Sequence, residues 1–161
     1  MNETCAAIEL IAAYRAAHYC VRLHGGRSVA LRVGSACPPE LVEMLACERT
    51  RVGALITAWN PFSRPAARRD NRRRQRELLD GLRSAGARVL VGAGSGEGWR
   101  EPGFAAFDMH LAALDALARH FAQNAILTFC AETTVRLRLY RSDWRDALAG
   151  ADVDFAQPDT Q

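Results

Sequence analysis

Leu55-Ile56-Thr57-Ala58-Trp59-Asn60-Pro61 ends a nearly unbroken apolar run at a polar residue that is followed by proline. The run starts at Val52 and is too apolar to alternate between a buried and an exposed face, which predicts a strand covered on both sides. Proline lacks the backbone N–H that a central strand needs, so the strand must stop before it. We therefore expect a buried strand over residues 52–59 that places Asn60 at the edge of a sheet.

The composition is that of one ordinary globular domain. The chain has 161 residues, of which 49% are hydrophobic and 24% charged, and its net charge is only +3. No apolar run approaches the roughly 20 residues that a membrane span needs. We expect one domain over 1–141 and an acidic, largely disordered tail over 142–161.

The cysteines form no C-x-x-C pair and indicate free thiols in a reducing cytoplasm; they are Cys5, Cys20, Cys37, Cys47 and Cys130.

Three elements are predicted before the central strand. Apolar residues recur at helical spacing over 4–17, which predicts an N-terminal helix. Alternating runs over 19–23 and 29–33 flank Gly25-Gly26, a pattern typical of a β-hairpin because glycine adopts the positive φ of a tight turn. Pro38-Pro39-Glu40 then favours the start of a short helix.

The chain after the central strand predicts a repeated alternation of helix and strand. Leu78 and Leu82 lie one turn apart, and Asp115 and Arg119 are expected to form an exposed pair at helical spacing. We read the glycine-rich stretch 92–98 as a mobile connection. Helices are expected over 66–84 and 109–122, and strands over 88–91, 104–107, 125–129 and 135–140.

From Val52 to Phe129 the predicted order is strand, helix, strand, strand, helix, strand. This order is typical of the ferredoxin-like split βαββαβ unit, an α+β fold with an antiparallel sheet and both helices on one face. The N-terminal helix, the hairpin and the short helix would extend this core. The fold class is therefore predicted to be α+β with a ferredoxin-like core.

A group of short motifs resembles a bacterial family, the domain of unknown function numbered thirty-two ninety-three. The most specific motif is T-A-x-N-P at 57–61, and the likeness covers roughly residues 5–140. Ala122 stands where we would expect glycine. The resemblance implies a single small domain and carries no assigned activity. The other motifs are Asn71 and Gln75 before Leu78, then Glu101-Pro102, then Phe121-Ala122-Gln123-Asn124-Ala125.

These motifs contain a carboxylate and five amides that are candidates for a site. A carboxylate held beside amides can orient a sugar, an amide or a water molecule, so Glu101 is the candidate catalytic acid or base. The alternative is that the amides satisfy backbone groups at turns and helix ends. The candidate ligand-binding amides are Asn60, Asn71, Gln75, Gln123 and Asn124.

Seven arginines lie within the thirteen residues from Arg64 to Arg76. Such a run can bind the phosphates of RNA or DNA. Against this, the net charge is small and no aromatic residue interleaves the run for base stacking. A solvated helix face is the alternative. Arg64 and Arg68, near the start of the predicted helix, are the candidates for binding a small anion.

Several classes of site lack their motifs in this sequence. The glycine-rich stretch does not match G-x-G-x-x-G and has no P-loop lysine. The four histidines have no metal-ligand spacing, and no serine or cysteine lies in a recognised nucleophile motif. We therefore expect neither a metal nor a cofactor.

Three hypotheses about function follow. The first is a small regulatory or accessory module that binds an anionic ligand, a nucleotide or RNA, through Arg64, Arg68 and the amides. The second is a hydrolase or transferase that uses Glu101 as acid or base. The third is a protein-interaction adaptor that meets a protein partner through its acidic tail or an exposed Trp144.

Overall fold

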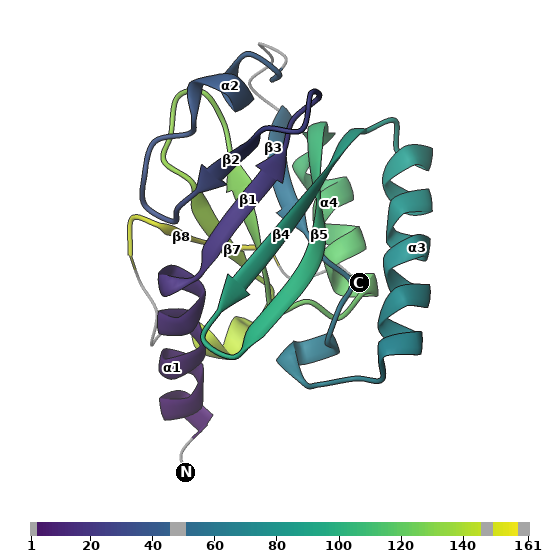
Figure 1. The fold of residues 1–161 in the computed structure, drawn as a ribbon. Helices are drawn as coiled ribbons and strands as arrows, with labels where there is room; N and C mark the ends of the chain where they lie inside the picture. The colour runs from purple at the N-terminus through teal and green to yellow at the C-terminus, as the bar shows by residue number, and fades with distance from the viewer. Residues whose placement is uncertain (1–2, 46–50, 146–149, 158–161) are drawn as a thin grey trace.

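A computed structural model describes residues 3–45, 51–145 and 150–157 of the chain. Within these residues the protein is a mixed α+β structure with helices on both faces of a curled sheet of eight strands (Figure 1). The helices are α1 (Glu3–Ala16), α2 (Pro39–Val42), α3 (Arg68–Ser84) and α4 (Leu111–His120), and 3-10 turns span Pro61–Ser63 and Ser142–Trp144. The strands are β1 (His18–Arg22), β2 (Ser28–Leu31), β3 (Arg51–Ile56), β4 (Arg88–Gly96), β5 (Trp99–His110), β6 (Ala125–Phe129), β7 (Arg136–Leu139) and β8 (Val153–Phe155).

The sheet runs in the order β2-β1-β4-β5-β3-β6-β7-β8 and is antiparallel except where β7 pairs with β8. The predicted central strand is β3, which lies between β5 and β6 and is buried at every position from Gly53 to Ile56. The strand ends earlier than expected because side chains replace a neighbouring strand as acceptors. The N–H of Ala58 donates to Gln75, and the N–H of Trp59 donates to Thr57.

The outer face of the sheet is covered by α3 and α4 (Figure 1). Leu78 and Leu82 of α3 and Leu114 and Ala118 of α4 are fully buried against β3, β5 and β6. The leucine spacing on α3 thus produces the predicted packing. The expected exposed pair of Asp115 with Arg119 is wrong, because Asp115 is buried and pairs with Arg138 of β7.

The inner, concave face carries α1 and α2, and the β1–β2 hairpin forms one edge of the sheet. Gly25 and Gly26 turn the hairpin with φ of 92° and 88°, as predicted. The chain after β2 then reaches across to β7, where the N–H of Gly34 donates to Val135 and the N–H of Val135 donates to Ser35. These bonds draw the two sides of the sheet together, so the inner face is a trough that α1 covers at one end.

The glycine-rich stretch is not a mobile loop. Residues 92–96 are the end of β4, which pairs with β5 as far as Gly96 opposite Trp99 and also pairs with β1, and residues 97–98 form the turn between β4 and β5. The missing side chains allow this pairing, since a Cβ on Gly92 would lie 2.5 Å from Leu55 Cδ1 and 2.9 Å from the Cys20 carbonyl oxygen. The glycines therefore mark a close approach of strands rather than a flexible connection.

The predicted disordered tail differs from the structure in the part that is described. Val153–Phe155 forms β8, and Val153 and Ala156 are buried. Trp144 is only 7% exposed and packs in the inner core, so the expected exposed Trp144 is wrong. The physical reason is that Trp144, Val153 and Phe155 of this acidic segment pack against the inner core, and β8 pairs with the edge strand β7. Residues 146–149 and 158–161 lie outside the described residues.

No helix in the described parts of the chain is long and apolar enough to cross a membrane.

Candidate functional site

A cavity of about 270 Å³ lies between α1, the inner face of the sheet and the segment that joins β3 to α3. Most of its wall is apolar, with residues from α1 and from six strands. Its exposed lining residues are Ala13 of α1 and Ser63 and Pro65 of the joining segment, which therefore form its mouth. The trough of the curled sheet thus holds a preformed pocket, a common arrangement for small-molecule sites.

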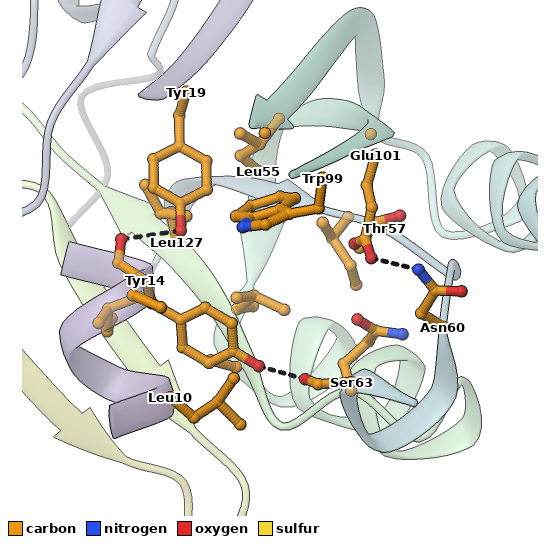
Figure 2. A pocket seen from close by; sticks show the side chains of 18 of the residues that line it. Leu10, Tyr14, Tyr19, Leu55, Thr57, Asn60, Ser63, Trp99, Glu101 and Leu127 are labelled. Atoms are coloured by element: carbon orange, nitrogen blue, oxygen red, sulfur yellow. Dashed lines mark hydrogen bonds between the residues drawn. The ribbon is translucent and has the colours of Figure 1, made fainter. Parts of the chain in front are cut away.

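Three aromatic side chains surround the cavity (Figure 2). Tyr14 and Tyr19 are linked because the Tyr19 hydroxyl donates to the carbonyl oxygen of Tyr14 at 3.0 Å. Trp99 projects from β5 into the space between them and Glu101. Burial raises the pKa of both tyrosines, so their hydroxyls stay protonated at neutral pH.

Glycines of β4 make room for these rings. A Cβ on Gly94 would lie 3.0 Å from the Tyr19 ring and 3.4 Å from the Trp99 ring, and one on Gly96 would lie 2.4 Å from Trp99 Nε1. Successive residues of a strand face opposite sides, so glycines two apart clear one face. The alternating pattern G-A-G-S-G at 92–96 was the sequence signal for this site, and reading the stretch as a loop missed it.

Glu101 supplies the carboxylate of the cavity wall. Its Oε1 accepts a hydrogen bond from Asn60 Nδ2 at 2.7 Å, while Oε2 has no hydrogen-bond partner among the described residues (Figure 2). Burial raises the pKa of Glu101, and the bond from Asn60 partly offsets this effect. The wall therefore presents a fixed carboxylate with one oxygen available to a ligand.

Asn71 and Asn60 are locked to each other by two hydrogen bonds. Asn71 Nδ2 donates to Asn60 Oδ1 at 2.9 Å, and the N–H of Asn60 donates to Asn71 Oδ1 at 2.9 Å. Asn60 has a φ of 48°, a left-handed value that asparagine tolerates better than most residues. Asn71 thereby fixes the backbone that carries Asn60, although its own side chain does not line the cavity.

Gln75, Gln123 and Asn124 also hold the joining segment. Gln75 Oε1 accepts from the N–H of Ala58 at 3.0 Å, and Gln123 Nε2 donates to the carbonyl oxygen of Trp59 at 3.1 Å. Asn124 Nδ2 donates to Ser63 Oγ at 3.0 Å. The structure therefore brings all six predicted polar residues to one end of the sheet, and those that line the cavity are Asn60, Glu101 and Gln123.

The residue at 122 has the conformation that glycine favours. Ala122 has a φ of 53°, and its carbonyl oxygen accepts a hydrogen bond from the N–H of Phe62 at 2.6 Å. Alanine in this region is strained by its Cβ. The turn after α4 thus has a left-handed residue at the position where glycine is expected.

The arginines of the run lie away from the cavity lining. Arg64 and Arg68 are exposed, so an anion-binding role for them stays a prediction. Arg74, which the sequence did not single out, is half-buried under the joining segment. It donates to the carbonyl oxygens of Ala58 at 3.1 Å and Phe121 at 2.5 Å. Arg74 therefore helps to hold the segment in place.

Ser63 is a serine of the cavity lining, and its hydroxyl shares a hydrogen bond with the Tyr14 hydroxyl. The raised pKa of Tyr14 keeps that phenol protonated at neutral pH, so it cannot take the proton of the serine and the pair does not activate the serine. The four histidines are all exposed, and the described residues contain no cluster of three His, Cys, Asp or Glu side chains that would hold a metal ion. Acid or base chemistry in the cavity would therefore depend on Glu101.

Comparison with known proteins adds a family match. No curated protein and no solved structure gives a significant match to the chain. The family match leaves out α1, β1 and β7, which supply Tyr14, Tyr19 and Leu137 to the cavity, and includes all six polar residues of the site. Residues 56–126 match the model of the family described as "Protein of unknown function (DUF3293)", which confirms the resemblance seen in the sequence.

Proposed function

We propose that this protein binds an apolar small molecule in the cavity beneath α1. The observation that carries this proposal is a preformed pocket of about 270 Å³ with aromatic and aliphatic walls and a few converging polar groups. Ligand sites in proteins are typically apolar clefts of this kind, in which a few polar atoms fix orientation. Glu101, Asn60 and Gln123 would provide that orientation.

The charge of the wall favours a neutral or cationic ligand over the anion expected from the arginine run. Glu101 is the carboxylic acid in the lining, and no arginine or histidine lines the cavity among the described residues. A carboxylate in an apolar wall repels a phosphate or another carboxylate. Nucleotide binding, if it occurs, would have to use the exposed Arg64 and Arg68 outside the cavity.

The test is a titration with N-phenyl-1-naphthylamine, a neutral apolar dye whose fluorescence rises when it leaves water. Ala13→Phe places a ring at the mouth, and we expect it to raise the Kd about tenfold or more by excluding the dye. The matched control is Ala12→Phe, because Ala12 is exposed on the same helix and does not line the cavity. Equal dye binding by both variants and the wild type would refute the proposal.

A second candidate function is catalysis by Glu101. The observation that favours it is the raised pKa of a carboxylate held in place by Asn60, since general acids and bases are often tuned in this way. The hydrolase or transferase reading predicts that a bound compound is converted by the wild type and not by Glu101→Gln. Mass spectrometry of compounds that raise the melting temperature would decide this. Recovery of every compound unchanged would reject catalysis.

The exposed side of α3 supports a separate proposal, binding of RNA or DNA. Its exposed arginines are Arg68, Arg69, Arg72, Arg73, Arg76 and Arg83. A triple change of Arg68, Arg69 and Arg73 to Glu should abolish salt-dependent binding to a short RNA. The control changes Arg22, Arg27 and Arg32 to Glu, which alters the net charge equally on another exposed surface. Equal loss from both triple variants would indicate a net-charge effect rather than a site.

We also propose that the core is ferredoxin-like and that the protein works in the cytoplasm. The strand order β4-β5-β3-β6 and the placement of α3 and α4 on one face support the fold assignment. The free thiols of Cys20, Cys37 and Cys130 support a reducing compartment. A crystal structure would test the ferredoxin-like core, and localisation of a tagged chain would test the cytoplasmic location.

A further inference from the structure

The polar groups of the cavity wall are unequal in charge. Tyr14, Tyr19, Asn60 and Gln123 are neutral hydrogen-bonding groups, whereas Glu101 carries a negative charge when ionised. An ionised carboxylate that loses water on ligand binding is destabilised unless a cation or a strong donor replaces the water. A ligand that supplies such a group at Glu101 is therefore expected to bind in this cavity more tightly than one that does not.

The carboxylate is held in a position to receive it. Asn60 binds Oε1, and Asn60 is itself fixed by two hydrogen bonds to the buried Asn71. This arrangement leaves Oε2 for a ligand. The side chain is part of a connected network, so its orientation does not have to be established at the moment of binding.

An aromatic ring accompanies the carboxylate on the same strand. Trp99 and Glu101 are two residues apart in β5, so they project from the same face, and both line the cavity. Figure 2 shows Trp99 between Glu101 and the two tyrosines. A carboxylate beside aromatic faces is a combination that attracts an ammonium group, through an ion pair and through the ring quadrupoles.

We propose that the cavity is selective for an amine: a ligand with an apolar body and one protonated amino group, which binds Glu101 Oε2 while its body packs against Trp99, Tyr14 and Tyr19. This inference rests on the proposed function, because it assigns a ligand class to the same cavity. The uncharged apolar wall formed by Leu55, Leu127 and Leu137 accepts the body of the ligand.

Three compounds with one phenylethyl body separate the effect of the polar group from that of the apolar body. Isothermal titration of the wild type would use 2-phenylethylamine, 2-phenylethanol and 3-phenylpropionate, which are cationic, neutral and anionic at pH 7. We expect the amine to bind about tenfold or more tightly than the alcohol, because charge-assisted hydrogen bonds are the stronger ones. The carboxylate should bind weakest.

Glu101→Gln keeps an acceptor for Asn60 and removes the charge. It should remove the preference for the amine and leave binding of the alcohol nearly unchanged. Glu97→Gln is the matched control, because Glu97 is exposed in the turn of the same hairpin and does not line the cavity.

Two outcomes overturn the inference in different ways. Alcohol binding that equals amine binding in the wild type, or an amine preference that survives Glu101→Gln, would reject amine selectivity and leave the small-molecule pocket standing. Failure of all three compounds and of the apolar dye to bind would reject the pocket itself. Because the wild-type series discriminates by itself, the test does not depend on the folding of a variant.

Discussion

The two faces of the sheet are covered to different extents. On the outer face, α3 and α4 fill the space against the strands, and Leu78, Leu82 and Leu114 are fully buried. On the inner face, α1 presents Leu10 and Tyr14 to a cavity that they only partly fill. Figure 1 shows the two outer helices beside the sheet and α1 at one end of the trough.

This difference separates stability from binding. Close packing removes apolar surface from water and stabilises the fold, but it leaves no space for a ligand. A partly covered trough gives up some of that stabilisation and keeps a preformed site. We therefore expect substitutions on the outer face to change mainly stability, and substitutions on the inner face to change mainly binding.

The largest difference in the loss of unfolding free energy should appear between substitutions in two ion pairs. On the outer side, Asp115 Oδ1 and Oδ2 each lie 2.6 Å from a nitrogen of Arg138, and the two side chains are 11% and 10% exposed. On the inner side, Asp152 pairs with Arg15 of α1, and these side chains are 25% and 38% exposed. Asp115→Ala should lower the free energy of unfolding by about 3–5 kcal/mol, because it leaves a buried charge unpaired.

Asp152→Ala should cost about 1 kcal/mol or less, since solvent screens an exposed pair. Urea unfolding of the two variants measures both effects. If Asp152→Ala lowers the free energy of unfolding as much as Asp115→Ala does, or more, the expected difference in stability between the two faces is wrong.

Leucine truncation gives the next largest contrast. Leu78→Ala on α3 should cost about 2–5 kcal/mol, because it creates a cavity in a filled core. Leu10→Ala on α1 should cost about 1 kcal/mol, because its half-buried side chain already borders open space. Thermal and urea unfolding would measure both values, and similar costs at the two positions would contradict the account of a partly filled trough.

The smallest effect concerns Glu101 and pH. Its raised pKa means that the folded state holds this proton to a higher pH than the unfolded state does. Stability therefore falls as pH rises through the interval between the unfolded and the folded pKa, and the penalty persists above it. Glu101→Gln should melt at a higher temperature than the wild type at pH 7, and this gain should vanish below about pH 4.

Ionisation of Asp152 has the opposite effect on stability, because it stabilises the folded state at neutral pH. Its bond with Arg15 lowers its pKa, so its contribution to stability is present at neutral pH and disappears as pH falls through the folded pKa. Melting curves of Asp152→Asn and Glu101→Gln over pH 3–8 should therefore diverge from the wild type in opposite directions at pH 7. A lower melting temperature for Glu101→Gln at pH 7 would contradict the assigned shift.

The local elements of the fold could largely be predicted from the sequence, because the signals that define them are local. The hairpin follows from Gly25-Gly26, and the inward stripe of α3 follows from the spacing of Asn71, Gln75, Leu78 and Leu82. β8 could not be predicted in this way. Its three residues are too few for a pattern, and they are ordered by pairing with β7.

The candidate site divides in the same manner. The six polar residues could be selected by motif, but the position of Gln123 beside Trp59 depends on how the turn after α4 meets the end of β3. The cavity itself was missed, because its wall combines Tyr14, Trp99 and Leu137 from distant parts of the chain. The alternating glycines of β4 were the local sequence signal for the cavity, because a period of two is typical of a strand and not of a loop.

The measurement that tests the central claim most directly is a two-dimensional NMR titration of the protein with 2-phenylethylamine and 2-phenylethanol. Gly94, Gly103 and Ala125 line the cavity, whereas Leu78 and Leu114 belong to the outer core. The account predicts that saturable shifts of backbone amide signals concentrate at the first three residues and spare the other two. Shifts that are absent from the cavity residues, or are equal on both faces of the sheet, would contradict it.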